Sequence, residues 1–418
     1  MIILLGWRYR VEEGFKELIS RYQGSHSLPR QFYTSETLYK MDIEHYWNHS
    51  WIWVGHINQI SNVGDFFLFD YGYESIIVAR DKDKCINAFL NVCRHRGSRV
   101  CIEKSGNNRV FACPYHAWTY ELNGNLRAAR EMGDGFDKAK HSLKRVNLRI
   151  FHGLIFICIS DDPPNIDEGL LQLEELVAPF EFENLKIVHS ANYPVAADWK
   201  LALENYMECY HCAPAHLEYS RSHSLKDPSS ANIELKNCLL NKSIEVGLSG
   251  DELQINGLGS KDVEMDFYFS RYPLFQGYQT GSKSGKKLAP LLGKLKDFDG
   301  GTTDIQIGIL NNFLSYSDHV IGYRFIPRSL QSTDIEVIWM VRQDAEEGID
   351  YNLEDLIWLW HCTSQDDERI IALNQKGVNS DHYVPGPLSN MEWGIKAFHA
   401  GYLKQLDKKT NINSKNFV

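Results

Sequence analysis

Four residues in the first half of the chain have the types and the spacing of ligands to an iron–sulfur cluster. Cys93 and His95 form a Cys-x-His pair, and after seventeen intervening residues Cys113 and His116 form a Cys-x2-His pair. A zinc finger more often keeps its two cysteines together and its two histidines together. One cysteine and one histidine on each of two loops instead suit a [2Fe–2S] cluster in which the cysteines hold one iron and the histidines hold the other.

This ligand set is that of a Rieske cluster, which we therefore predict. Gly97 and Pro114 stand where the backbone must turn tightly, and Tyr115 and Trp118 can shield the cluster or form hydrogen bonds near it. The alternatives are a zinc site or a chance spacing of four residues on β loops. A cluster that carries one electron at a time also requires an acceptor for its electrons, which favours a second metal site elsewhere in the chain.

The segment from Trp199 to His216 carries the second group of potential ligands. Its spacing predicts a helix over 199–212, on which Glu204, Glu208 and His211 lie at i, i+4 and i+7 and share one face. The same pattern is also compatible with an ordinary solvated helix face.

Two histidines at the end of this segment are separated in a way that requires a turn. His211 and His216 are five residues apart, so a continuous helix would rotate them by about 140° relative to each other. Because Pro214 disfavours helical geometry at Ala213, we expect the chain to turn there and to bring His216 back towards His211. Two histidines taken alone are more often structural than metal-binding.

A mononuclear iron site of the 2-His-1-carboxylate type needs one further acid and leaves coordination positions open for O₂. Acidic candidates lie in the segment 364–370, which contains Asp366 and Asp367. Cys209 and Cys212 also form a Cys-x2-Cys pair, but they lie late in the expected helix and not at a helix N-terminus after a strand. A redox-active dithiol is therefore disfavoured.

Hydrophobic periodicity divides the chain into an all-β module and a mixed domain, so the fold class is α+β. Residues 36–48 have helical spacing, and from Trp51 short apolar runs alternate with turn residues as in antiparallel strands. Two prolines in the segment 161–165 end this module.

Beyond that boundary, helices and strands are both expected. Helical periodicity covers 168–177, 199–212 and 353–374, and a strand pattern covers 335–341. Residues after Leu406 are polar and are expected to be a disordered tail. The predicted divisions are an N-terminal helical part over 1–50, the β module over 51–164, the catalytic domain over 165–406 and the tail over 407–418.

Composition limits where the protein works and what it binds. A formal charge of −10 without a dense basic run argues against nucleic acid as a partner. No stretch has the length of apolar sequence that a membrane helix needs, and the apolar start Met1–Leu5 lacks a basic leader, so a cytoplasmic location is expected. Nine cysteines, an odd number without an export signal, favour metal ligation over disulfides.

Both groups of ligands, in this order, resemble the α subunits of the Rieske ring-hydroxylating oxygenases over nearly the whole chain. The motifs that carry the resemblance are Cys93–Ser98, Cys113–Tyr120, Glu204–Cys212 and Asn379–Pro387. Within the family they are most similar to the glycine betaine monooxygenase branch, beside choline, carnitine and stachydrine oxygenases. The resemblance implies a Rieske domain inserted into a helix-grip catalytic domain, that is, an antiparallel sheet with helices, in a homotrimer.

The resemblance also implies roles for individual residues. It gives Asp367, eight residues before Gln375, as the third ligand of the iron beside His211 and His216, with Asp366 as the fallback. Glu208 would connect the iron site to the Rieske histidine of a neighbouring subunit. Asn205 would lie near the iron without being a firm ligand. One departure from the family is Asp198, where relatives commonly have asparagine.

No flavin or nicotinamide site is recognisable in the sequence, so the electrons of NAD(P)H must arrive through a separate flavin and iron–sulfur reductase. With a [2Fe–2S] cluster, a mononuclear Fe(II) and O₂, the expected reaction on a quaternary ammonium compound is oxidative N-demethylation that releases formaldehyde. The alternatives are an aromatic-ring dioxygenase and a non-catalytic Rieske electron carrier. Aromatic side chains that favour a quaternary ammonium by their ring faces are expected among Phe267–Phe269, Tyr272, Phe275, Tyr278 and Trp339, although most of these are more simply core residues.

Overall fold

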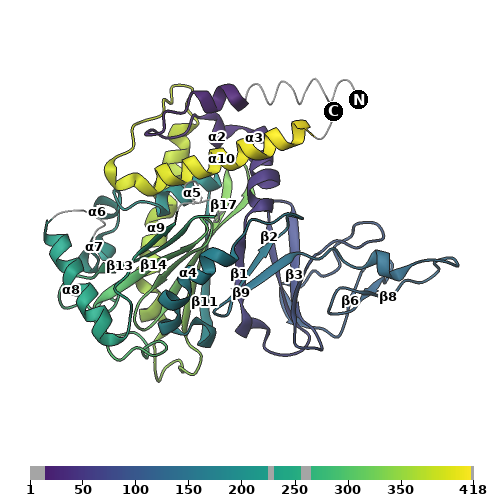
Figure 1. The fold of residues 1–418 in the computed structure, drawn as a ribbon, viewed down its shortest axis with the longest axis horizontal. Helices are drawn as coiled ribbons and strands as arrows, with labels where there is room; N and C mark the ends of the chain where they lie inside the picture. Colours follow the sequence, from purple (N-terminus) through teal and green to yellow (C-terminus); the bar gives the residue numbers. More distant parts are fainter. Residues whose placement is uncertain (1–14, 225–229, 256–264, 416–418) are drawn as a thin grey trace.

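The computed structural model describes residues 15–224, 230–255 and 265–415. Figure 1 shows an elongated molecule, with a β-rich part at one end of its longest axis and a large sheet covered by helices at the other. Outside the described residues lie the start Met1–Leu5, the rest of the first fourteen residues of the predicted 1–50 segment, and the last three residues of the predicted tail.

The β-rich part is built from three small antiparallel sheets, as the short alternating runs predict. Their strand orders are β1-β10-β9, β4-β3-β2-β5 and β6-β7-β8. The strands are β1 (Ile52–His56), β2 (Asp65–Tyr71), β3 (Glu74–Arg80), β4 (Ile86–Leu90), β5 (Ser105–Asn107), β6 (Phe111–Ala112), β7 (Thr119–Tyr120), β8 (Leu126–Ala128), β9 (Asn147–Phe151) and β10 (Leu154–Cys158).

The larger part is organised around a seven-stranded antiparallel sheet with the order β11-β17-β16-β15-β14-β13-β12. The predicted strand over 335–341 lies within β17, in the interior of this sheet. The strands are β11 (Leu185–Val195), β12 (Leu253–Ile255), β13 (Phe267–Pro273), β14 (Gly301–Ile307), β15 (Asn312–Ser315), β16 (Val320–Ser329) and β17 (Ser332–Arg342).

Helices cover this sheet, and the long helix α9 contacts β11 and β17. An all-β module beside an antiparallel sheet with helices confirms the predicted α+β fold class. The helices are α2 (Gln31–Thr34), α3 (Glu36–Met41), α4 (Asp167–Val177), α5 (Trp199–Tyr206), α6 (Cys212–Ala215), α7 (Leu217–Ser222), α8 (Ser230–Val246), α9 (Leu353–Val378) and α10 (Trp393–Lys415).

Two sequence-based expectations about helices need correction. The helical spacing of 36–48 is divided, because α3 ends at Met41 and is followed by a π-helical turn and a 3₁₀ turn that reach His49. The tail predicted to be disordered from 407 is helical as far as Lys415, since it continues α10. Leu406, directly before this stretch, is fully buried, so α10 is packed against the core at that position.

A tryptophan of the β module packs directly against the large sheet. The Trp53 ring is buried and lies so close to Gly322 in β16 that a Cβ atom on that glycine would stand 2.4 Å from the indole. The backbone N–H of Trp53 donates to the side chain of Asn311, and the guanidinium of Arg324 lies 5.0 Å from the centre of the indole. The joint between the two parts is therefore a packed, hydrogen-bonded contact.

The start of α5 is fixed by a group of three buried ionisable side chains. Asp198 caps the helix, because its carboxylate accepts from the Lys200 N–H. The Lys200 ammonium forms ion pairs with both Asp42 and Asp198, and all three side chains are fully buried. The backbone N–H of Asp198 donates to Gln375 in α9 at 2.8 Å. These contacts set the position of α5, which precedes the two predicted histidine ligands, against α9, which carries Asp367.

Candidate iron–sulfur and iron sites

Two loops of matching geometry carry the predicted cluster ligands. In the first, the Gly97 N–H donates to the Cys93 carbonyl, and in the second the Ala117 N–H donates to the Cys113 carbonyl. Gly97 has φ of 79° and Ala117 has φ of 57°, so both loops turn through the left-handed region. The predicted tight turn at Gly97 is thus present, while the turn of the second loop is taken by Ala117.

The four predicted cluster ligands lie close together in the β module. Cys93 and Cys113 are buried, and the exposed imidazoles of His95 and His116 approach each other with 3.2 Å between their Nδ1 atoms. Buried thiols behind two exposed imidazoles are the arrangement that a [2Fe–2S] cluster with a solvent-facing histidine iron requires. The residues present therefore fit a Rieske cluster.

Aromatic side chains pack on both histidines, as predicted. The Trp118 ring stacks on His95 at 5.0 Å, and the Tyr115 ring stacks on His116 at 4.0 Å. The hydroxyl of Tyr120 lies 3.4 Å from the Cys93 sulfur and accepts from the Arg94 N–H. Rings against the imidazoles and a hydroxyl at the sulfur hold the ligands in place and adjust the polarity around them.

The segment expected to be one helix over 199–212 is broken, because α5 ends at Tyr206. The cause is local. The Glu208 carboxylate accepts from the backbone N–H groups of Tyr210 and His211, and such hydrogen bonds compete with the helical pattern. Glu204 is therefore not on a common face with Glu208, and its carboxylate instead accepts from Tyr33 at 2.9 Å and pairs with His399 at 2.8 Å.

The turn that brings the two histidines together also lies elsewhere than predicted. Pro214 belongs to the short helix α6, in its first turn, where a missing N–H costs no hydrogen bond. His211 precedes α6 and His216 follows it, with φ of −120° and ψ of 86° at His216. The two imidazoles nevertheless converge, with 3.1 Å between their Nε2 atoms.

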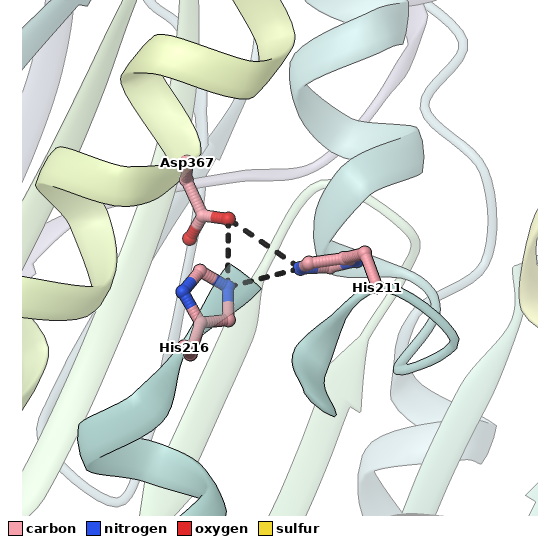
Figure 2. Close-up of side chains that lie close together, drawn as sticks. All are labelled: His211, His216 and Asp367. Atoms are coloured by element: carbon pink, nitrogen blue, oxygen red, sulfur yellow. Dashed lines mark hydrogen bonds and ion pairs between the residues drawn. The ribbon is translucent and has the colours of Figure 1, made fainter. Parts of the chain in front are cut away.

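Asp367 completes this group from the middle of α9 (Figure 2). One carboxylate oxygen, Oδ1, lies 3.4 Å from His211 Nε2 and 3.1 Å from His216 Nε2. Asp366, the fallback ligand, instead faces the far nitrogen of His216, Nδ1, at 3.5 Å. The geometry thus brings Asp367, and not its neighbour, to the two Nε2 atoms.

These three side chains have the spacing of ligands on one metal ion. The three ligand atoms lie 3.1 to 3.4 Å from one another, so a single metal ion could contact all of them. Burial alone would raise the pKa of Asp367, but the two imidazoles hold it below its ordinary value. Burial would lower the pKa of His211, yet Asp367 and Glu208 raise it to about 9. A metal ion that binds Nε2 of His211 would displace the proton from that nitrogen.

Glu208 and Asn205 both lie against His211. The Glu208 carboxylate contacts His211 Nδ1 at 2.5 Å, so it holds the ring with Nε2 directed towards Asp367. Asn205 Nδ2 lies 3.4 Å from His211 Nε2. Both predicted residues therefore stand beside the iron site, Glu208 behind the first histidine and Asn205 at its ligand atom.

Cys209 and Cys212 are joined in a disulfide. The bond closes the loop that contains His211, between the end of α5 and the start of α6. A redox-active dithiol was not expected here, because the spacing predicted that both cysteines lie late in one helix. Since α5 has already ended at Tyr206, Cys209 lies between the two helices and can approach Cys212 at the start of α6.

A cavity adjoins the histidines and Asp367, and all three side chains contribute to its lining. The sequence did not predict the aromatic residues that line this cavity, which we call the aromatic wall. None of the aromatic residues expected at the substrate is among the described residues of the lining. Two of these aromatic residues could have been found by their closeness in sequence to the predicted ligands, since Tyr219 follows His216 by three residues and Trp360 precedes Asp367 by seven. The aromatic residues that line the cavity are Tyr206, Tyr219, Tyr323, Phe325 and Trp360.

Comparison with known protein families identifies both parts of the chain. The Rieske [2Fe-2S] domain family matches residues 50–146, and the family of ring hydroxylating alpha subunits, catalytic domain, matches residues 182–408. The chain belongs to the Rieske oxygenase family. A Rieske [2Fe–2S] cluster and a mononuclear iron are accordingly the cofactors of this oxygenase, and the reading as an electron carrier without a catalytic centre is set aside.

Relatives of this oxygenase are known from several bacteria. It is 33% identical to the glycine betaine monooxygenase oxygenase subunit of Chromohalobacter salexigens, over 91% of this chain and 86% of that protein. It is also 33% identical to the subunit of the same name from Pseudomonas aeruginosa PA14, over 91% of this chain and 89% of that protein. Membership of the monooxygenase group within the family is therefore shown.

Solved structures share the fold of this oxygenase. A quaternary ammonium Rieske monooxygenase in complex with L-carnitine superimposes with a TM-score of 0.68 at 22% identity, covering 93% of this chain and 97% of that one. A structure described as revealing inter-subunit electron transfer in such an enzyme has a TM-score of 0.69 at 21% identity, with coverage of 93% and 96%. Within the described residues, no helix is long and apolar enough to cross a membrane.

Proposed function

We propose that this oxygenase removes a methyl group from glycine betaine by oxidation and yields dimethylglycine and formaldehyde. The supporting observation is its 33% identity, over 91% of the chain, to glycine betaine monooxygenase oxygenase subunits. The cavity beside His211, His216 and Asp367 agrees with this substrate, since ring faces attract a quaternary ammonium that has no N–H to donate.

We assign the four residues that lie close together in the β module, Cys93, His95, Cys113 and His116, to the Rieske cluster. The mononuclear iron we assign to the three residues that meet beside the cavity, His211, His216 and Asp367. When bound, this iron supplies the activation of O₂ by electrons that the Rieske cluster delivers. These three side chains would hold the iron and leave coordination positions open for O₂.

The side chains around this iron position the reacting groups. Glu208 holds the His211 ring in one tautomer, with Nε2 towards the metal, because its carboxylate accepts from Nδ1–H. The aromatic wall holds the ammonium with one methyl group towards the metal ligands. Hydroxylation of that methyl gives a hemiaminal, which breaks its C–N bond, releases formaldehyde and leaves a tertiary amine. O₂ and NAD(P)H are consumed in equal amounts with the substrate.

Electrons, in this proposal, pass from NAD(P)H through a flavin and iron–sulfur reductase to the cluster of one subunit and then to the iron of the next. Figure 1 supports a route between subunits, because β6 and β8 at the cluster end lie at the opposite end of the longest axis from α6. A head-to-tail homotrimer would bring each exposed His116 to a neighbour's Glu208. We place the enzyme in the cytoplasm, where NAD(P)H is regenerated.

Product analysis tests the proposed reaction. The purified chain, supplied with a Rieske oxygenase reductase, NAD(P)H and glycine betaine, is expected to form dimethylglycine and formaldehyde in equal amounts. Metal analysis of the same preparation should give three irons and two acid-labile sulfides per chain. A hydroxylated arene product, with O₂ consumed but no formaldehyde from any quaternary amine, would instead establish an aromatic-ring dioxygenase. Zinc without sulfide would refute both metal assignments.

A further inference from the structure

The loop between α5 and α6 is closed by a disulfide that has no part in the proposed reaction. Cys209 and Cys212 are the only cysteines among the described residues that are joined in this way. In the cytoplasm, where we place this enzyme, thiol reductants keep most cysteines reduced, and the disulfides that do form are usually transient, catalytic or redox-sensing. A bond that opens and closes is therefore expected at this pair.

The disulfide joins the segments on both sides of His211. Cys212 starts α6, and its carbonyl accepts from the His216 N–H at 3.0 Å and from the Ser220 hydroxyl at 3.2 Å. Cys212 is therefore fixed to the segment that carries the second histidine. Cys209 lies in the loop that follows α5. The bond thus ties the loop that contains His211 to the segment that contains His216.

On its other side, His211 is held by hydrogen bonds to one carboxylate. Glu208 accepts from the His211 N–H at 3.1 Å and contacts Nδ1 at 2.5 Å. A covalent link across so short a loop removes conformations that hydrogen bonds alone permit. The closed bond therefore helps to keep His211 Nε2 at 3.1 Å from His216 Nε2 and at 3.4 Å from the Asp367 carboxylate.

Both cysteines line the iron-site cavity, although they are only 5% and 6% exposed. A small oxidant can reach them through the cavity, and hydrogen peroxide is one of suitable size. One peroxide and two thiols give the disulfide and two waters: the S–S bond forms, the O–O bond breaks, and the thiols supply two electrons and two protons. In reverse, two molecules of a small thiol reduce the bond to two cysteine thiols and are themselves joined as a disulfide.

We infer that Cys209 and Cys212 form a reversible redox site that controls how firmly the mononuclear iron is held. This inference rests on the proposed function, because it takes His211 as a ligand of that iron. In the disulfide form the loop keeps His211 beside the other two ligands, and the site retains iron. In the dithiol form the loop has more freedom, and the site releases iron more readily. The pair thus keeps iron in the enzyme when peroxide is present.

The rate of iron release tests this control without turnover. One sample of the holoenzyme is treated with hydrogen peroxide and another with a phosphine reductant, and thiol labelling with mass spectrometry reports the state of the pair. Both samples are then loaded with Fe(II) in the absence of oxygen and exposed to a chelator of Fe(II). The dithiol form should release the mononuclear iron about tenfold faster, because a change beside a metal ligand alters metal affinity by about 10- to 100-fold. The absorption of the Rieske cluster should be the same in both samples.

Two variants show whether this pair is the cause. Cys209→Ser cannot form the bond, so it should release iron at the rate of the dithiol form after either treatment. Cys362→Ser is the matched control, because Cys362 lies on α9 with Asp367 and forms no disulfide. It should respond to the two treatments as the wild type does.

The comparison of the two wild-type samples needs no variant, so it decides the matter even if Cys209→Ser fails to fold. Equal rates of iron release from the two samples would overturn the inference, and so would a pair that stays in one state under both treatments. Wild-type protein that binds no mononuclear iron in either state would refute the proposed iron site itself. Equal release of bound iron refutes only the redox control.

Discussion

Mixing two inactive variants tests whether electrons cross between subunits. Cys93→Ser removes a cluster ligand and His211→Ala removes an iron ligand, so each homo-oligomer lacks one centre and should be inactive. In a ring with one direction of contact, a junction works when an intact cluster of one chain faces an intact iron of the next. Random assembly of equal amounts makes that arrangement at about one junction in four, because each chain type is chosen with a probability of about one half.

The expected activity of the equimolar mixture is therefore about a quarter of the wild-type value, and a three-to-one mixture should give about a fifth. Formaldehyde release is the assay, and two affinity tags, purified in sequence, show that mixed oligomers have formed. A mixture of Cys93→Ser with Cys113→Ser is the matched control, because no intact cluster is present and no activity should appear. Doubly tagged oligomers without turnover would refute the route between subunits, since transfer within one chain predicts none.

Three further predictions concern single side chains. The Asp367→Ala variant should lose the mononuclear iron and its turnover but keep the absorption of the cluster, because two histidines alone hold Fe(II) poorly. If Asp366→Ala loses the iron instead, the ligand assignment is wrong. Glu208→Gln should keep both metals in metal analysis but lower the turnover about 10- to 100-fold, and wild-type turnover would remove its positioning role. Between about pH 4 and pH 7, the unfolding free energy of Asp198→Asn should decrease less than that of the wild type, as measured by denaturant titration at each pH.

The sign of the last effect follows from the buried charges. Burial raises the pKa of Asp198 from 3.8 to about 7. The folded protein therefore holds a proton that the unfolded chain releases near pH 4, and the associated stability is present below that pH and is lost as the pH rises through 7. Asparagine does not titrate, so its variant lacks this part of the slope. A slope identical to that of the wild type would show that Asp198 is not protonated in the folded state.

The cluster site was predictable from the sequence because its ligands are local. Each Cys and His pair sits within one loop, so the spacing of residue types alone specifies which side chains meet. The two histidines of the predicted iron site became candidates only beside the predicted cluster, and Asp367 followed from a resemblance that fixes its position before Gln375. The hydrogen bond from the Asp198 backbone to Gln375 now gives a physical reason for that register.

The rest of the site depends on contacts between distant segments, which the sequence pattern does not contain. Helical periodicity predicted that α5 continues beyond Tyr206, but the Glu208 carboxylate accepts hydrogen bonds from the backbone N–H groups of Tyr210 and His211 and so competes with the helical pattern. The aromatic wall comes together through the placement of β16 and α9. Alternation along a strand indicates which side chains share a face, but not which cavity that face adjoins.

The contact between Trp53 and Gly322 has a consequence for building hybrid enzymes. The indole of Trp53 occupies the space that a side chain at position 322 of β16 would need. A cluster module taken from another oxygenase therefore fits only if it has tryptophan at the position of Trp53 and the receiving sheet has glycine at the position of Gly322. Asn311 and Arg324, which hold the Trp53 backbone and ring, would have to match as well. Modules exchanged only at their loop boundaries would lose this fit, and the cut should instead keep β1 together with the catalytic sheet that receives it.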